Sequence, residues 1–392
     1  MNNKRILTSF LAAALTLSLT ACSSTQENSN TTSTLSGTQS AAGDTSNRPE
    51  RAVTSANSAQ SAPESTESSA QSNPESTSAP QSSEETSYTP PNNGQQGEVS
   101  GSILVLPGGR GIMLYGIGYG PGRNYAATVN KYKQQLGANV NVYSMVVPTQ
   151  VSFYLPEKYF GEGLSDRELP HIDDINENLS GIIPIDAFAA LKGHSDEEIY
   201  YRTDHHWTQL GAYYAAKAFA ETALVPFDEL SAYDQHEKEG YVGTLYGSSN
   251  EDPEIGNNPE TFFWYIPKRD FTTTYYNPDM TNEQQGSYFY DPDNFGSTAE
   301  WNLTYMAGDG RITHVNTGLN TGRKLMILKD SYADSFAPNL FGSFDDIWIV
   351  DMRYCETSAV QLAKDKGITD LLFCSCTFSA TAQNQYKLEE IM

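Results

Sequence analysis

The chain has 392 residues, with 48 Asp and Glu against 24 Lys and Arg and a formal net charge of -24 at pH 7. Nucleic acids require a basic face and anionic lipid surfaces attract one, so this balance excludes nucleic acid as a partner and argues against docking flat on anionic headgroups. A neutral substrate, such as an uncharged sugar, is easier to reconcile with so acidic a protein.

The first 22 residues have the pattern of an export signal. Two basic residues precede an apolar run, residues 6–19, that is too short to span a bilayer. The run ends in Leu19-Thr20-Ala21-Cys22, which resembles a bacterial lipobox, whose cysteine carries diacylglycerol. We expect residues 1–22 to be a lipoprotein signal peptide and Cys22 to hold the protein by its lipid on the extracellular face of the cell membrane. A cleaved signal peptide with an accidental cysteine is the alternative.

A low-complexity tether follows. Residues 23–99 consist mainly of Ser, Thr, Gln, Asn, Ala, Pro and Glu, with almost no aromatic or branched apolar side chain. Such a segment cannot bury enough apolar surface to offset its ordering entropy, so we expect it to be disordered. As a random coil it would reach roughly 50 Å. The composition changes abruptly after it, and residues 100–392 are long enough for one large folded domain.

Strands and helices alternate in the predicted domain. Apolar runs predict strands at 103–106, 141–147, 199–201, 324–328, 347–350 and 370–374. Helical spacing of apolar residues predicts helices at 125–136, 207–224 and 358–365. The alternation near the C-terminus favours a parallel sheet with helices on its faces, and the irregular stretch 236–320 is expected to form long loops or an inserted layer.

Two polar segments carry the chemistry. Ser331 follows a strand and precedes a helix, so its hydroxyl would be exposed beside free N–H groups that can stabilise an oxyanion. A serine becomes a nucleophile only when a base takes its proton. The chain has six histidines, of which His205 and His206 directly follow Asp204 at the start of the strongest helix. A carboxylate bonded to an imidazole fixes its tautomer, so these residue types favour a Ser-His-Asp triad.

Simpler interpretations remain open for each piece. Asp204 and Asp330 could be helix caps, and adjacent histidines are often one buried and one exposed residue without chemistry. A metal bound by Asp204, His205 and His206 is a weaker hypothesis, because the sequence offers no obvious further ligands; we expect no metal.

The motifs resemble those of a known family. Residues 200–208, Tyr-Tyr-Arg-Thr-Asp-His-His-Trp-Thr, resemble the signature of the DHHW family, which is similar to the alginate O-acetyltransferase domains of SGNH-hydrolase-like fold. The segments around Pro148, Ser331 and Arg353 extend the resemblance over most of residues 101–392. It implies an α/β fold with a parallel sheet flanked by helices, and a permuted motif order, because the serine comes after the histidine.

The resemblance also implies roles for individual residues. Ser331 would be the nucleophile, His206 its base and Asp204 the group that orients the imidazole. The chain departs from the usual SGNH pattern at Lys329, which stands where a glycine precedes Asp-Ser. Further candidates for contacts to the substrate or the oxyanion are Gly308, Asp309, Tyr332 and Arg353.

We therefore expect an extracytoplasmic O-acyl, specifically O-acetyl, transferase or esterase that acts on a cell-surface polysaccharide. The resemblance implies a membrane-bound O-acyltransferase as a partner and no soluble cofactor. A non-catalytic glycan-binding or envelope-assembly lipoprotein on the same fold is the alternative. The sequence leaves open whether water or a sugar hydroxyl accepts the acyl group.

The remaining cysteines leave the disulfide question open. Cys355, Cys374 and Cys376 are an odd number, so at least one thiol stays unpaired within the chain. A bridge between Cys374 and Cys376 would be strained. A bridge from Cys355 to one of them and three buried free thiols are both compatible with the sequence.

The lipid anchor can be tested by one substitution. Cys22→Ala removes the thiol that would carry diacylglycerol, so the protein should leave the membrane fraction for the medium or remain unprocessed. Immunoblots of fractionated cells measure this outcome. Retention of processed Cys22→Ala protein in the membrane fraction would contradict the assignment.

Overall fold

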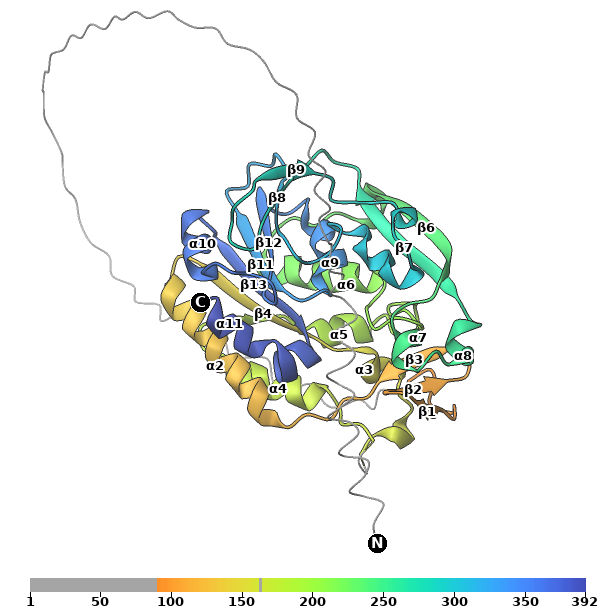
Figure 1. Cartoon of the computed structure of the whole chain (residues 1–392). Coiled ribbons are helices and arrows are strands. Elements are labelled where there is room, and N and C mark those ends of the chain that lie inside the picture. The colour runs from red at the N-terminus through yellow and green to blue at the C-terminus, as the bar shows by residue number, and fades with distance from the viewer. Residues whose placement is uncertain (1–89, 162–163) are drawn as a thin grey trace, which may run out of the picture. The chain divides into compact units, whose positions relative to one another are not determined.

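The computed structural model describes residues 90–161 and 164–392 (Figure 1). The expected signal peptide, Cys22 and most of the expected tether lie outside these residues. None of the described helices has the length and hydropathy needed to cross a membrane.

An eight-stranded sheet is the centre of the described domain, with the strand order β5-β4-β13-β11-β12-β10-β8-β9. The strands from β5 to β12 pair in parallel, whereas β10, β8 and β9 add an antiparallel edge. The strands are β4 (Asn141–Val147), β5 (Ile183–Pro184), β8 (Thr272–Tyr276), β9 (Gln284–Gly286), β10 (Ile312–Asn316), β11 (Lys324–Lys329), β12 (Asp346–Asp351) and β13 (Asp370–Cys376). The predicted fold class, a parallel sheet flanked by helices, is confirmed.

Helices cover both faces of this sheet (Figure 1). One face carries α2 (Tyr119–Leu136), α4 (Leu169–Glu177), α10 (Ala359–Asp365) and α11 (Gln385–Glu390). Their apolar sides form one buried cluster with β4, β11, β12 and β13. The other face carries α5 (Ala187–Lys192), α6 (Gln209–Ala223) and the short α9 (Ala333–Phe336). The central strands are buried on both sides, which explains their continuous apolar runs.

The structure departs from the prediction at residues 199–201 and decides between the two alternatives for residues 236–320. The strand expected at 199–201 is only an isolated bridge between Tyr200 and Trp207, because the three apolar residues have no neighbouring strand to pair with along their length. The stretch 236–320 is not irregular throughout. It holds the antiparallel pair of β6 (Tyr233–Tyr241), which begins just before it, and β7 (Glu260–Pro267), in addition to the edge strands β8 to β10. The inserted layer is thus the correct alternative of the two that we considered for that stretch.

Residues 90–99, which we assigned to the tether from their composition, contact the domain. Asn92 Nδ2 donates a hydrogen bond to the Tyr154 carbonyl at 3.3 Å, and the Gly97 N–H donates to the Tyr159 hydroxyl at 2.7 Å. Strand β1 (Glu98–Ser100) then pairs with β2 (Ile103–Leu106), which also pairs with β3 (Arg110–Met113). Polar composition concealed these backbone contacts, so the folded domain includes residues before the predicted boundary at 100.

The three cysteines outside the signal region are free and buried. Of the two arrangements compatible with the sequence, the structure therefore has the free thiols.

The contribution of residues 90–100 can be measured by truncation. A chain that begins at Gly101 lacks the β1–β2 pairing and the bonds from Asn92 and Gly97, whereas a chain that begins at Pro90 keeps them. Each net hydrogen bond contributes about 1 kcal/mol, so the shorter chain should melt roughly 5 °C lower, still in one transition. Equal melting temperatures by circular dichroism would contradict a structural role for these residues.

Candidate active site

Ser331 lies in the turn between β11 and α9, at the carboxyl end of a parallel strand with neighbours on both sides. Such sheet edges are where ligands bind in α/β folds. Asp330 holds this turn. Its Oδ2 accepts a hydrogen bond from the Cys376 N–H at 2.9 Å, and its Oδ1 accepts one from the Tyr332 N–H at 3.0 Å. The serine is thereby tied to the end of β13 and remains partly exposed.

The segment from Asp204 to His206 approaches Ser331 from the start of α6. Thr208 caps this helix, since its side chain accepts a hydrogen bond from the Gly211 N–H. Gln150, which follows β4, donates to the Asp204 carbonyl at 2.5 Å. A Cβ at Gly243 would lie 2.3 Å from the Asp204 Cβ, so only glycine fits beside this turn.

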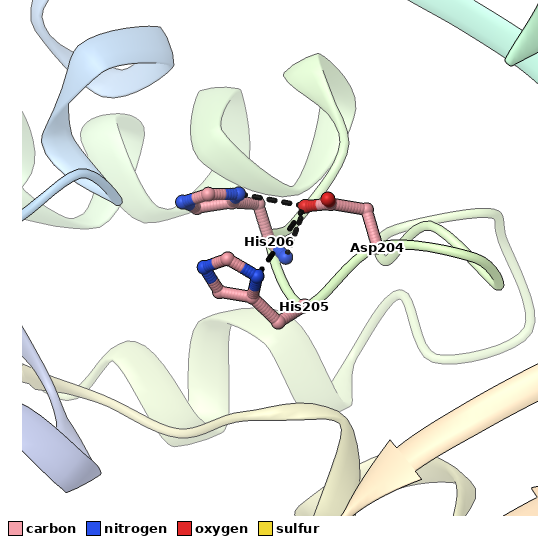
Figure 2. Close-up of side chains that lie close together, drawn as sticks. All are labelled: Asp204, His205 and His206. Carbon is pink, nitrogen blue, oxygen red and sulfur yellow. Dashed lines mark hydrogen bonds and ion pairs between the residues drawn. The ribbon is translucent and has the colours of Figure 1, made fainter. Parts of the chain in front are cut away.

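The three residues predicted to act together meet in space. The His206 Nδ1–H donates to Asp204 Oδ1 at 2.7 Å, and the Ser331 hydroxyl donates to His206 Nε2 at 2.8 Å. Asp204 is fully buried and His206 is 7% exposed. Figure 2 shows the first of these contacts, with His206 turned edge-on to the Asp204 carboxylate.

Asp204 is surrounded by hydrogen-bond donors. Its carboxylate accepts from the His206 N–H at 3.0 Å, from the Thr244 N–H and hydroxyl at 2.9 and 2.8 Å, and from Asn302 Nδ2 at 3.3 Å. Burial raises the pKa of Asp204, but the two histidines and the bonds from His206 and Thr244 outweigh it and lower this pKa well below its usual range. The carboxylate is therefore ionised and fixed in position.

His205 lies beside His206 with a ring-centroid distance of 3.8 Å. Its Nδ1 contacts the Thr244 hydroxyl at 2.7 Å, and its carbonyl accepts a hydrogen bond from the Tyr332 hydroxyl at 2.5 Å. Burial, together with the neighbouring His206, lowers the pKa of His205 to about 4. At neutral pH its imidazole is therefore uncharged.

Lys329 belongs to a buried ionic cluster behind the serine turn. Its ammonium group contacts Asp334 at 2.5 Å, Asp351 at 3.0 Å and also Asp309. Arg353 bridges Asp351 at 2.6 Å and Asp309 at 2.8 Å. Burial and the nearby Asp309 raise the pKa of Asp334 well above its usual range. Two cations and three carboxyl groups thus share one buried site.

The other predicted site residues support the site from within the protein. Asp309 and Arg353 are members of the ionic cluster, and Tyr332 donates its hydroxyl proton to the His205 carbonyl. Gly308 has a φ of 100° in the turn before Asp309, a conformation that favours glycine.

The sequence did not single out an oxyanion donor at the serine itself. The backbone N–H of Ser331 has no acceptor among the described residues, which makes it a candidate oxyanion donor.

Sequence reasoning missed Asn302 and Tyr241. Asn302, in the 3-10 helix η5 (Thr298–Thr304), donates to Asp204 and, at 3.0 Å, to the Tyr241 hydroxyl. Both residues lie in the stretch that looked irregular, where no spacing or motif marks them.

Asp204, His205 and His206 are also a group that could hold a metal ion, since their donor atoms lie within 4.8 Å of one another. The two ring nitrogens of His206 are engaged by Asp204 and Ser331, so a metal at His206 would have to replace one of these bonds. The donor set fits the hydrogen-bonded arrangement better than a tetrahedral metal site.

Comparison with known proteins identifies the family. The model of the family described as DHHW protein matches residues 46–350. The chain belongs to the DHHW family. A DHHW protein from Eubacterium siraeum is 42% identical in sequence, and the match covers 75% of this chain and 97% of that one with a TM-score of 0.70.

Two further structures are more distant. Bacillus cereus PatB1, solved with a sulfonyl adduct, is 18% identical over 74% of this chain and 97% of its own, with a TM-score of 0.58, so the likeness concerns the fold alone. The O-acetyltransferase domain of Pseudomonas putida AlgJ matches at 13% identity and a TM-score of 0.41, over 76% of this chain and 100% of that one. A search among curated proteins gave no match.

The ionic cluster predicts a large cost for Lys329→Met. The substitution leaves buried carboxylates without their central cation, which should destabilise the fold by about 3–5 kcal/mol. Lys324→Met, at the exposed end of the same strand, removes a surface contact with Asp346 and should cost under about 1 kcal/mol. Urea denaturation gives both values, and equal costs would contradict the proposed importance of the cluster.

Proposed function

We propose that this DHHW protein is an extracytoplasmic O-acyl, specifically O-acetyl, transferase or esterase that acts on a cell-surface polysaccharide. The observation that carries the proposal is the continuous hydrogen-bonded chain from Asp204 through His206 to Ser331, with distances of 2.7 and 2.8 Å. A nucleophile bonded to a base, which is in turn oriented by a buried carboxylate, is the arrangement that acyl transfer requires.

In the first half-reaction, the Ser331 oxygen attacks the acyl carbonyl while His206 Nε2 takes its proton. The donor oxygen then leaves with that proton, and an acyl ester remains on Ser331. In the second half-reaction, a hydroxyl of water or a sugar gives its proton to His206 Nε2 and attacks the ester, and the proton returns to the Ser331 oxygen. The Asp204 carboxylate stabilises the imidazolium that forms in both steps.

The charge that develops on the carbonyl oxygen needs donors close to Ser331. The free N–H of Ser331 itself is the donor we assign to this role, because it adjoins the attacked carbon once the ester forms. The Asp330 contacts keep the turn rigid, so this N–H is aimed before the substrate arrives.

The location and the partners belong to the same proposal. The Leu19-Thr20-Ala21-Cys22 motif supports a lipid anchor on the extracellular face, and the net charge of -24 suits a neutral glycan. The acyl group would be delivered across the membrane by a membrane-bound O-acyltransferase, so the site would need no soluble cofactor.

A sulfonyl fluoride probe tests the nucleophile. Such reagents modify activated serines, so the intact protein should be labelled at Ser331 and the Ser331→Ala variant should not. His206→Ala should slow labelling by orders of magnitude, because the three residues act as a unit. Peptide mapping by mass spectrometry locates the adduct.

Ser335→Ala is the matched control, since Ser335 lies in α9 one turn beyond Ser331. Its hydroxyl accepts from Trp207 Nε1 at 3.0 Å, but that nitrogen also donates to the Tyr332 carbonyl at 2.9 Å, so the variant keeps one of the two bonds. Labelling should persist in this variant. An adduct on Ser335, or equal labelling of His206→Ala and the intact protein, would contradict the assignment of Ser331 as nucleophile and His206 as its base. An intact protein that is not labelled would favour the glycan-binding alternative.

A further inference from the structure

The Asp204 carboxylate is connected by hydrogen bonds to both histidines of the site. Asp204 Oδ1 accepts the proton of His206 Nδ1, and Asp204 Oδ2 accepts the hydroxyl proton of Thr244 at 2.8 Å. The Thr244 oxygen also lies 2.7 Å from Nδ1 of His205. Asp204 therefore hydrogen-bonds one imidazole directly and the other through a hydroxyl, while its direct contact with His205 Nδ1, also drawn in Figure 2, is longer, at 3.8 Å.

This connection fixes the tautomer of His205. An ionised carboxylate accepts protons only, so the single hydroxyl proton of Thr244 points to Asp204. The Thr244 oxygen can then serve His205 only as an acceptor, which places a proton on His205 Nδ1. In the neutral ring the Nε2 of His205 carries a lone pair, as does the Nε2 of His206 before it takes a proton.

The lone pair of His205 faces the reacting side of the site. Figure 2 shows the rings of His205 and His206 side by side, with the nitrogen atoms far from Asp204 turned to the same side. The ring of Tyr332, which adjoins Ser331, lies 5.2 Å from His206 and 6.3 Å from His205. The His205 side chain is 27% exposed, and its Nε2 has no hydrogen-bond partner among the described residues.

We infer that His205 is a specificity-determining residue whose Nε2 accepts a hydrogen bond from a second hydroxyl of the acceptor, so that the site selects vicinal diols such as adjacent hydroxyls of a sugar ring. The inference rests on the proposed function. The attacking hydroxyl has one proton, which goes to His206 Nε2, and it therefore cannot also donate to His205. Its neighbour on the ring can donate, and the two imidazoles, whose planes differ by 37° and whose centroids lie 3.8 Å apart, offer two acceptors side by side.

His205 takes no proton in this scheme. The oxygen of the attacking hydroxyl bonds to the acyl carbon, the bond from that carbon to the Ser331 oxygen breaks, and the proton held by His206 returns to Ser331. The neighbouring hydroxyl keeps its proton and only donates a hydrogen bond. The low pKa of His205 agrees with this role, because a protonated ring would lose its lone pair and repel the His206 imidazolium.

Competition between two acceptors tests the inference. The full-length protein is acetylated with p-nitrophenyl acetate in the presence of equal amounts of trans-1,2-cyclohexanediol and trans-2-methoxycyclohexanol, and the two acetylated products are measured. The methoxy compound keeps the ring and one hydroxyl but has lost the second donor. One hydrogen bond should favour the diol by roughly fivefold to tenfold, after correction for its second reactive hydroxyl. The product ratio depends only on molecules that turn over, so it is insensitive to partial unfolding.

Two variants test the roles of the two ring nitrogens of His205 one at a time. In His205→Gln the amide lies near the position of Nε2 and can still accept from the substrate, so most of the preference should remain. In His205→Asn the amide lies near the position of Nδ1, keeps the contact with Thr244 and cannot reach the substrate, so the preference should disappear.

A wild-type protein without preference, or equal ratios in the two variants, would overturn the inference while acetylated Ser331 still supports the proposed function. If mass spectrometry finds no acetyl group on Ser331 of the wild-type protein, the proposed function fails and the inference fails with it.

Discussion

The site depends on one buried carboxylate. Asp204 is removed from water and forms no ion pair with a Lys or Arg of residues 90–161 or 164–392, so its charge is stabilised by hydrogen bonds and by the two imidazoles. An isolated ionised carboxylate in such a place would be very costly. Its donors come from the loop before α7 (Leu245–Ser248) and from η5, and both segments are therefore held to the start of α6. Loss of any of these donors would leave part of the Asp204 charge without a hydrogen bond. The inserted layer, which supplies them, therefore helps to hold the carboxylate that orients His206.

The serine turn is held by charge in a different way. Ser331 follows a strand that ends in Lys329, and the ionic cluster of Lys329, Arg353, Asp309, Asp334 and Asp351 lies beneath the turn. A glycine would let this turn bend freely, whereas a lysine bound to carboxylates from neighbouring segments restrains it. The departure from the usual serine block therefore has a structural explanation, with rigidity from paired charges in place of a flexible residue.

The sequence predicted the parts of the site that are local and missed those that are not. Asp204, His206 and Ser331 could be named because a contiguous motif and a strand-to-helix turn mark them. Asn302 donates to Asp204 and to the Tyr241 hydroxyl, and both residues come from a stretch without periodicity, where contacts depend on how distant segments pack. The parallel strands β4, β11, β12 and β13 were equally visible as apolar runs, whereas β8 and β10 lie in the stretch that looked irregular. The strand at β1 was not, because its residues are polar and its stabilisation comes from backbone pairing with β2.

Trp207 explains why the acidic residue and the histidines occur in one block with an aromatic residue directly after them. Its indole N–H donates to the Tyr332 carbonyl and to the Ser335 hydroxyl, and its ring stacks on Phe336 at 6.2 Å. These contacts join the start of α6 to the turn that carries Ser331. The distance from His206 to Ser331 is therefore set by a neighbouring residue of the same block. A base and a nucleophile placed far apart in sequence, in either order, can keep hydrogen-bond contact when one large side chain fixes the two segments together.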